Sequence, residues 1–295
     1  MRSSKFFLFA IAVASPLFPG SELAAHGAYH DVVADLKKDL NQDPNDAELR
    51  FKLAEAHAAH DEWRACEKEL RLVERLEPGK YPVVYLRGLA LHVAGKEKEA
   101  KSELDTFLAG NPNHGDALAT RGRVLISLGR PEEAAIDLQR AVDLAESPNP
   151  DLILELANTY RSLGRLEDAS GILDLGLKTA GDSTSLLLCA LDIEKEARLW
   201  DDALGRVDSL QHASPRPEPW MAERARLLAL SGRGDASRQA WMTLRKRIFS
   251  LPNLERGTPE NVRLLAEADR ATGRAAPAPV MAPPAVKNFS HTTSN

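Results

Sequence analysis

A glycine followed five residues later by an alanine recurs along this chain at a nearly constant interval. Three copies stand in register: Gly95 with Ala100, Gly129 with Ala134, and Gly164 with Ala169. Successive glycines are 34 and 35 residues apart, and a period of this length is typical of arrays in which helical pairs stack on one another. The interval therefore predicts an all-α solenoid whose units each pack against their neighbours.

The interval continues on both sides of these copies, with substitutions. Gly232 follows the third copy by 68 residues, and the skipped place holds Arg198, with Ala203 five residues later. One interval before the first copy, the same two places hold Asp61 and Cys66. The array is therefore expected to extend over most of the chain.

Local signals explain why the marked residues recur. Gly129 and Gly164 follow segments that end in Ser-Leu, where a left-handed residue ends a helix without a Cβ penalty. Pro131 suits the first position of the next helix, because no backbone N–H is needed there. Gly88 and Gly122 are small residues on the preceding helices, and they match the recurring alanines. These small residues predict that the two helices of each unit cross closely.

With these residues in place, each unit resembles a tetratricopeptide repeat, a pair of helices joined by a short turn. The resemblance implies a right-handed superhelical solenoid of about six helix-turn-helix repeats, with capping helices at both ends. The predicted divisions are a signal peptide at 1–25, an N-terminal capping helix at 26–46, repeats at 47–80, 81–114, 115–149, 150–183, 184–217 and 218–257, a C-terminal capping helix at 258–273, and a disordered Ala/Pro-rich tail at 274–295.

The fifth repeat and the caps are marked differently from the rest. Residues 185–198 lack both the small-residue patch and the turn glycine, so the first helix of the fifth repeat is the least clearly indicated element. Apolar residues at helical spacing predict a capping helix over 31–40. At the other end, Thr258 is expected to cap a helix that Gly273 ends.

The first residues have the features of an export signal. Arg2 and Lys5 precede an apolar stretch over 6–18 that is too short to span a bilayer. Cleavage after Ala25 would leave His26 as the first residue, and cleavage after Gly27 is an alternative. The mature chain is therefore expected to be periplasmic or secreted, with no membrane span.

Composition excludes some classes of function. The net charge is −5 and no run of Lys or Arg forms a stripe along the sequence, so a nucleic-acid-binding surface is not expected. The two cysteines, Cys66 and Cys189, lie in different repeats and are not expected to form a disulfide. Cys66 takes the place that alanine fills elsewhere, which indicates a packing role.

No catalytic motif stands out, so the protein is interpreted as non-enzymatic and no cofactor is expected. The sequence has no Walker loop, G-x-S-x-G, H-E-x-x-H or C-x-x-C motif. His57 lies at a packing position of the first repeat and is interpreted as a core residue. Cleavage after Ala25 would place His26 and His30 near a free amine, which makes copper binding an alternative hypothesis.

In tetratricopeptide proteins the inner face of the first helices lines a concave groove. The resemblance implies a partner-binding groove formed by Phe51, Glu55, Tyr85, Leu89, His92, Arg123, Leu154, Asn158, Arg161, Asp192 and Arg226. An extended segment with an apolar anchor and an acidic group would match this order of side chains.

The resulting hypothesis is an exported interaction scaffold that holds a segment of a partner protein in its groove. It would help to assemble or regulate an envelope or secreted complex. Metal handling through the processed N-terminus is the alternative, and the sequence leaves the partner and the oligomeric state open.

Overall fold

The computed structural model describes residues 19–181 and 183–274, and within them it contains fifteen helices and no strands. The predicted all-α class is therefore confirmed. The helices are α1 (Pro19–Gln42), α2 (Ala47–Ala59), α3 (Trp63–Leu76), α4 (Val83–Val93), α5 (Glu97–Gly110), α6 (Gly115–Ser127), α7 (Pro131–Leu144), α8 (Pro150–Ser162), α9 (Leu166–Ala180), α10 (Thr184–Glu196), α11 (Trp200–Ala213), α12 (Glu218–Leu230), α13 (Gly234–Ser250), α14 (Asn253–Arg256) and α15 (Pro259–Ala271).

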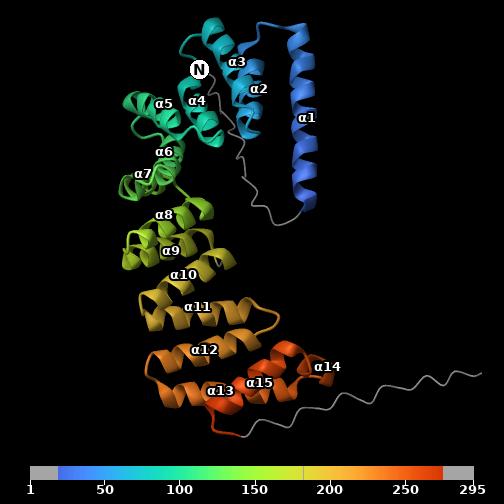
Figure 1. Cartoon of the computed structure of the whole chain (residues 1–295), viewed down its shortest axis with the longest axis vertical. Coiled ribbons are helices and arrows are strands. Elements are labelled where there is room, and N and C mark those ends of the chain that lie inside the picture. The colour runs from blue at the N-terminus through green and yellow to red at the C-terminus, as the bar shows by residue number, and fades with distance from the viewer. Residues whose placement is uncertain (1–18, 182, 275–295) are drawn as a thin grey trace, which may run out of the picture. The chain divides into compact units, whose positions relative to one another are not determined.

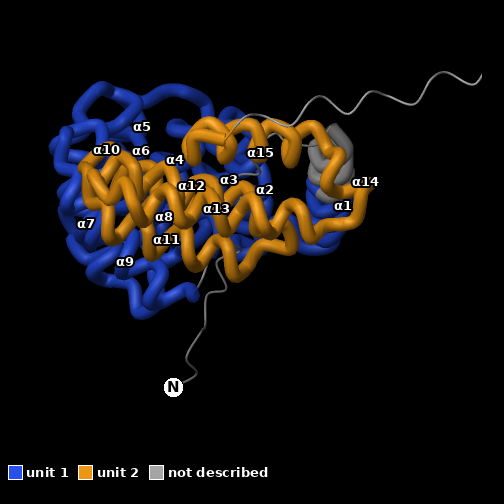
Figure 2. Tube along the Cα trace, turned by 90° about the horizontal axis from the view of Figure 1, so that it is seen from below, with its two compact units in different colours: residues 1–186 blue, residues 187–295 orange. Residues whose placement is uncertain are grey.

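The chain divides into two compact units, Met1–Leu186 and Leu187–Asn295 (Figure 2). In the first unit, α2 packs on α3, α4 on α5, α6 on α7 and α8 on α9, and the second helix of each of the first three pairs contacts the next pair (Figure 1). In the second unit, α12 packs against α11 and α13, and α15 covers α13. The boundary between the units falls within α10.

The helices of a pair cross closely where the sequence places small residues. Ala100, Ala134 and Ala169 are completely buried. A Cβ built on Gly122 would lie 2.8 Å from Cγ of Leu138, which is closer than two carbon atoms can approach without moving. Cys66 is also completely buried, and burial raises the pKa of its thiol to about 12, so this cysteine is a packing residue.

The turn between paired helices uses a left-handed residue in every pair that the glycine interval marks. Gly129 and Gly164 both have a φ of 72°, and Gly232 has 78°. Asp61 and Arg198 take the same conformation, at 58° and 59°. The fifth repeat therefore keeps the turn without a glycine. Its first helix, which the sequence marks least clearly, is present as α10. This helix is 13 residues long, the same length as α6, α8 and α12.

Both ends carry an additional helix. Helix α1 is longer than the predicted 31–40 segment, and it packs on α2 by placing Val33 and Leu40 against Leu53. At the other end, the hydroxyl of Thr258 accepts a hydrogen bond from the backbone N–H of Asn261 and caps α15, as expected. The short helix α14 was not anticipated.

The signal segment and the tail lie partly outside the described residues. Residues 1–18 and 275–295 are not described, and α1 begins at Pro19, before the predicted cleavage site. None of the described helices combines the length and the apolar character that a membrane span requires.

Candidate functional site

The predicted groove residues all fall on the first helices of their pairs. In the first unit these helices are α2, α4, α6 and α8, and in the second unit they are α12 and the part of α10 that follows Leu186. Contacts link α2 to α4 and α4 to α6, so the first helices of these neighbouring pairs lie beside one another. Each unit therefore presents its own set of first helices.

The aromatic positions are buried between pairs and do not line an open surface. Phe51 and Tyr85 are each only 7% exposed. The ring of Phe51 stacks on Tyr81 with centroids 5.1 Å apart, and Tyr85 packs against Phe107 and His114 at 5.5 and 5.1 Å. Tyr81 and His114 come from the following repeats, whereas Phe107 lies on α5 of the same pair as Tyr85. Both rings therefore support the surface of the first helices from inside, and a direct contact with a partner stays a prediction.

Leu89, Glu55 and His92 are partly accessible positions on α2 and α4. Leu89 is half-buried against the core of the first two pairs. Burial raises the pKa of the half-buried Glu55 carboxyl, and nearby Lys52 only partly opposes this effect. Nδ1 of His92 lies 2.8 Å from a carboxylate oxygen of Glu97 on α5. His92 is therefore held by its own pair.

Arg123 has a partner that the sequence analysis did not identify. Its Nε donates to both carboxylate oxygens of Glu155, each at 2.9 Å, which joins α6 to α8. The two side chains remain 38% and 33% exposed. The positive charge of Arg123 is therefore compensated by a carboxylate of the neighbouring repeat. The Arg123–Glu155 ion pair presents hydrogen-bond donors and acceptors side by side.

Three further predicted residues lie on α8, beside Glu155. Leu154 is half-buried, whereas Asn158 and Arg161 are exposed. Asn158 and Arg161 provide hydrogen-bond donors, and Leu154 provides an apolar contact. This surface, formed by Arg123, Leu154, Glu155, Asn158 and Arg161, is named the α6–α8 surface.

The second unit has a row of ion pairs of its own. Lys195 on α10 contacts Glu223 on α12, and Arg226 contacts both Glu223 and Glu267 on α15. Burial alone would raise the pKa of Glu223, but hydrogen bonds from Lys195 and Arg226 outweigh it and lower that pKa. Asp192 is exposed on α10. Arg226 is thus engaged by two carboxylates of its own unit.

The described residues offer no support for a metal site. They contain no group of three or more His, Cys, Asp or Glu side chains placed to hold an ion. The His26 side chain lies outside the described residues. His57 is buried, as expected, and its Nδ1 lies 3.0 Å from the hydroxyl of Tyr29.

Comparison with known proteins supports the repeat assignment. Residues 115–148 match the tetratricopeptide repeat family model, which coincides with the α6–α7 pair. No curated protein sequence matches the chain.

Solved structures resemble the fold at low sequence identity. PilW, a widely conserved type IV pilus biogenesis factor, is 19% identical with a TM-score of 0.53, covering 65% of this chain and 89% of PilW. PilF of Pseudomonas aeruginosa is 16% identical with a TM-score of 0.49, covering 77% and 99%. The tetratricopeptide protein TTC0263 of Thermus thermophilus is 22% identical with a TM-score of 0.47, covering 59% and 94%. The family match and the likeness to PilW show that the described residues have an all-helical fold that resembles tetratricopeptide repeat proteins.

Proposed function

We propose that this protein is an exported, non-enzymatic scaffold that binds an extended segment of a partner protein along its first helices. Such binding would serve the assembly or regulation of an envelope or secreted complex. The likeness to PilW concerns the fold, so the proposal names no pathway. Export rests on the basic and apolar residues at the start of the chain.

The α6–α8 surface carries the proposal. An extended peptide needs partners for its backbone N–H and C=O groups, and a contact for its side chains. The half-exposed pair of Arg123 and Glu155 supplies a donor and an acceptor, while Asn158 supplies both in one side chain. Leu154 adds the apolar contact. This combination is the reason for placing the partner segment here.

Site-specific photocrosslinking tests the location of the partner. A benzophenone amino acid would replace Asn158 on the α6–α8 surface or, as a control, the exposed Ser102 on the second helix α5. We expect a discrete crosslinked protein from position 158 in the envelope or secreted fraction, and none from position 102. Equal products from both positions would contradict binding at this surface.

A charge swap tests the role of the ion pair. Arg123→Glu alone would place two carboxylates together, and we expect it to weaken the crosslink at position 158. The double variant Arg123→Glu with Glu155→Arg restores a pair in reversed orientation. If the segment reads the order of these charges, the crosslink stays weak in the double variant; full recovery would show that the pair acts only on the stability of the surface.

A further inference from the structure

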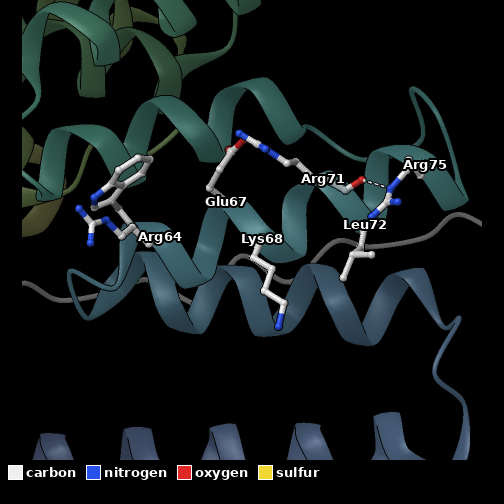
Figure 3. Close-up of a pocket in the computed structure, with 7 residues that line it drawn as sticks. Arg64, Glu67, Lys68, Arg71, Leu72 and Arg75 are labelled. Carbon is white, nitrogen blue, oxygen red and sulfur yellow. Dashed lines mark hydrogen bonds and ion pairs between the residues drawn. The ribbon is translucent and has the colours of Figure 1, made fainter.

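A second surface with an unusual charge lies on helix α3, away from the first helices. Arg64, Lys68, Arg71 and Arg75 follow one another at intervals of four, three and four residues. Residues at this spacing share one face of a helix. They border a hollow of about 390 Å³ whose lining also includes Trp63, Glu67 and Leu72 (Figure 3). These seven residues are named the α3 face.

Several cations of the α3 face have no carboxylate beside them among the described residues. The described residues offer no ion pair to Arg64 or Lys68, and both side chains are exposed. Nε of Arg75 donates to the backbone carbonyl of Arg71, at 3.3 Å, rather than to a carboxylate. The α3 face is therefore positive in a chain whose net charge is −5.

The acidic residue within this face is already engaged. Glu67 accepts hydrogen bonds from Arg71 at 2.8 Å and from Arg87 on α4 at 2.7 Å. With two arginines on one carboxylate, Glu67 cannot neutralise the remaining cations. Arg64, Lys68 and Arg75 therefore form the uncompensated part of the face.

Apolar surface accompanies the charge. Trp63 and Leu72 are both only partly buried. The Nζ of Lys96 lies 4.2 Å from the centroid of the Trp63 ring, which holds one side of that ring in place. A ligand of this face would therefore gain apolar contact as well as ion pairs.

We propose that the α3 face binds an acidic helical segment of a partner protein. The four cations span about 16 Å along the helix axis, since each residue adds about 1.5 Å. Glutamates at the same spacing on an opposing helix would each meet one cation, and a leucine between them would contact Leu72. Arginine forms paired hydrogen bonds with carboxylates, which favours such a partner.

The arrangement favours one helix over a flat anionic membrane. The exposed Glu74 lies on the same helix as the cations, and Arg87 is 3.5 Å from its carboxylate. A flat lipid surface would bring its anionic head groups against Glu74 as well, whereas a helix can place its glutamates opposite the cations alone. The proposal is independent of the α6–α8 surface, because α3 is the second helix of its pair.

Binding of a designed probe to the full processed chain tests this inference. The probe is a fluorescent helical peptide with glutamates at four-, three- and four-residue spacing and a central leucine; its twin has glutamine at the same places. The variant Arg64→Ala/Lys68→Ala/Arg75→Ala removes the uncompensated cations. Its matched control, Lys38→Ala/Lys98→Ala/Lys178→Ala, removes three exposed cations from α1, α5 and α9. Thermal melts of both variants establish that they fold.

We expect the acidic peptide to bind the wild type and the control equally, and to bind the α3 variant about tenfold more weakly. High salt should weaken binding, and the glutamine peptide should not bind. Equal binding by the two triple variants would overturn the proposal. Two further results would overturn it, each only if it requires the same three cations and is not inhibited by the acidic peptide. One is flotation of the wild type with phosphatidylglycerol vesicles, and the other is self-association of the wild type. An Asn158→Trp variant should still bind the peptide, which separates this result from any failure at the α6–α8 surface.

Discussion

Arg121 on α6 holds the carboxylate of Asp137 on α7 with two hydrogen bonds, of 2.6 and 2.8 Å. The Asp137 side chain is only 5% exposed, and the same arginine also contacts Asp105 on α5, at 2.9 Å. Arg87, 34 residues earlier, contacts carboxylates on the preceding and following helices in the same way. A recurring arginine therefore links each of these pairs to the one before it.

Removing this arginine is expected to destabilise the array. Arg121→Met would leave the buried Asp137 without its partner, and breaking a buried pair costs about 3 kcal/mol. Urea unfolding followed by circular dichroism measures the loss. The double variant Arg121→Met with Asp137→Leu should recover a large part of it; a double variant that is no more stable than the single one would contradict this account.

The close crossing at Gly122 predicts opposite results for two glycine substitutions. Gly122→Ala places a Cβ 2.8 Å from Leu138, so we expect a loss of about 1–3 kcal/mol from overpacking. Gly171→Ala, on the exposed side of α9, meets no atom within 4 Å and should gain about 0.5–1 kcal/mol from reduced backbone entropy. Both are measured by urea unfolding. Equal effects would show that Leu138 moves aside without cost.

The left-handed turns predict a second pair of opposite effects. Arg198 adopts a φ of 59° despite its Cβ, so Arg198→Gly should raise the free energy of unfolding by about 1 kcal/mol. Gly129→Ala should lower it by a similar amount, about 1 kcal/mol, because the open space around Gly129 leaves only the backbone penalty. Thermal melts of the two variants measure both effects. Destabilisation by Arg198→Gly would mean that the contacts of the arginine side chain add more to the free energy of unfolding than the left-handed backbone conformation takes away.

The packing of α1 on α2 predicts a pH dependence. Burial lowers the pKa of His57, with a further lowering from Lys37 on α1 and Lys68 on α3, while Glu69 and Glu62 oppose it. The neutral imidazole is therefore favoured in the folded state. Its contribution to the free energy of unfolding is complete above the unfolded pKa of about 6.5, and this contribution is lost as the pH falls below that value.

Urea unfolding at pH 7.5 and 5.5 measures this dependence. We expect His57→Phe to reduce the loss of stability between the two pH values, because it removes the group that must bind a proton. His212→Gln, at an exposed position near the end of α11, is the control and should leave the loss unchanged. An identical pH dependence in wild type and His57→Phe would exclude His57 as the titrating group.

Much of the array follows from local patterns. The glycine interval located the turns, and the small residues at Gly88 and Gly122 located the close helix crossings. The fifth repeat was harder to read, because Arg198 takes a conformation that sequence patterns associate with glycine. Helix α14 escaped prediction because four residues are too few to show a periodicity.

The candidate surfaces were only partly predictable. The repeat pattern placed the predicted groove residues on the first helices of their pairs, where the structure also has them, but it did not indicate that Phe51 and Tyr85 are buried or that Arg123 is paired. Those facts depend on neighbouring repeats: Tyr81 covers Phe51 from the following pair, and Glu155 lies 32 residues beyond Arg123. A pattern within one repeat carries no information about such partners.

The sequence by itself therefore determined the helices, their turns and their pairing, because these depend on backbone conformation and on small residues that recur within each repeat. Only the tertiary structure decided which charges are compensated. The offset between stacked helices brings Arg123 to Glu155 and Arg87 to Glu67, and among the described residues it leaves Arg64 and Lys68 on the α3 face without such a carboxylate. Side-chain pairing across repeats is set by packing distances of a few ångströms, which no spacing along the chain specifies.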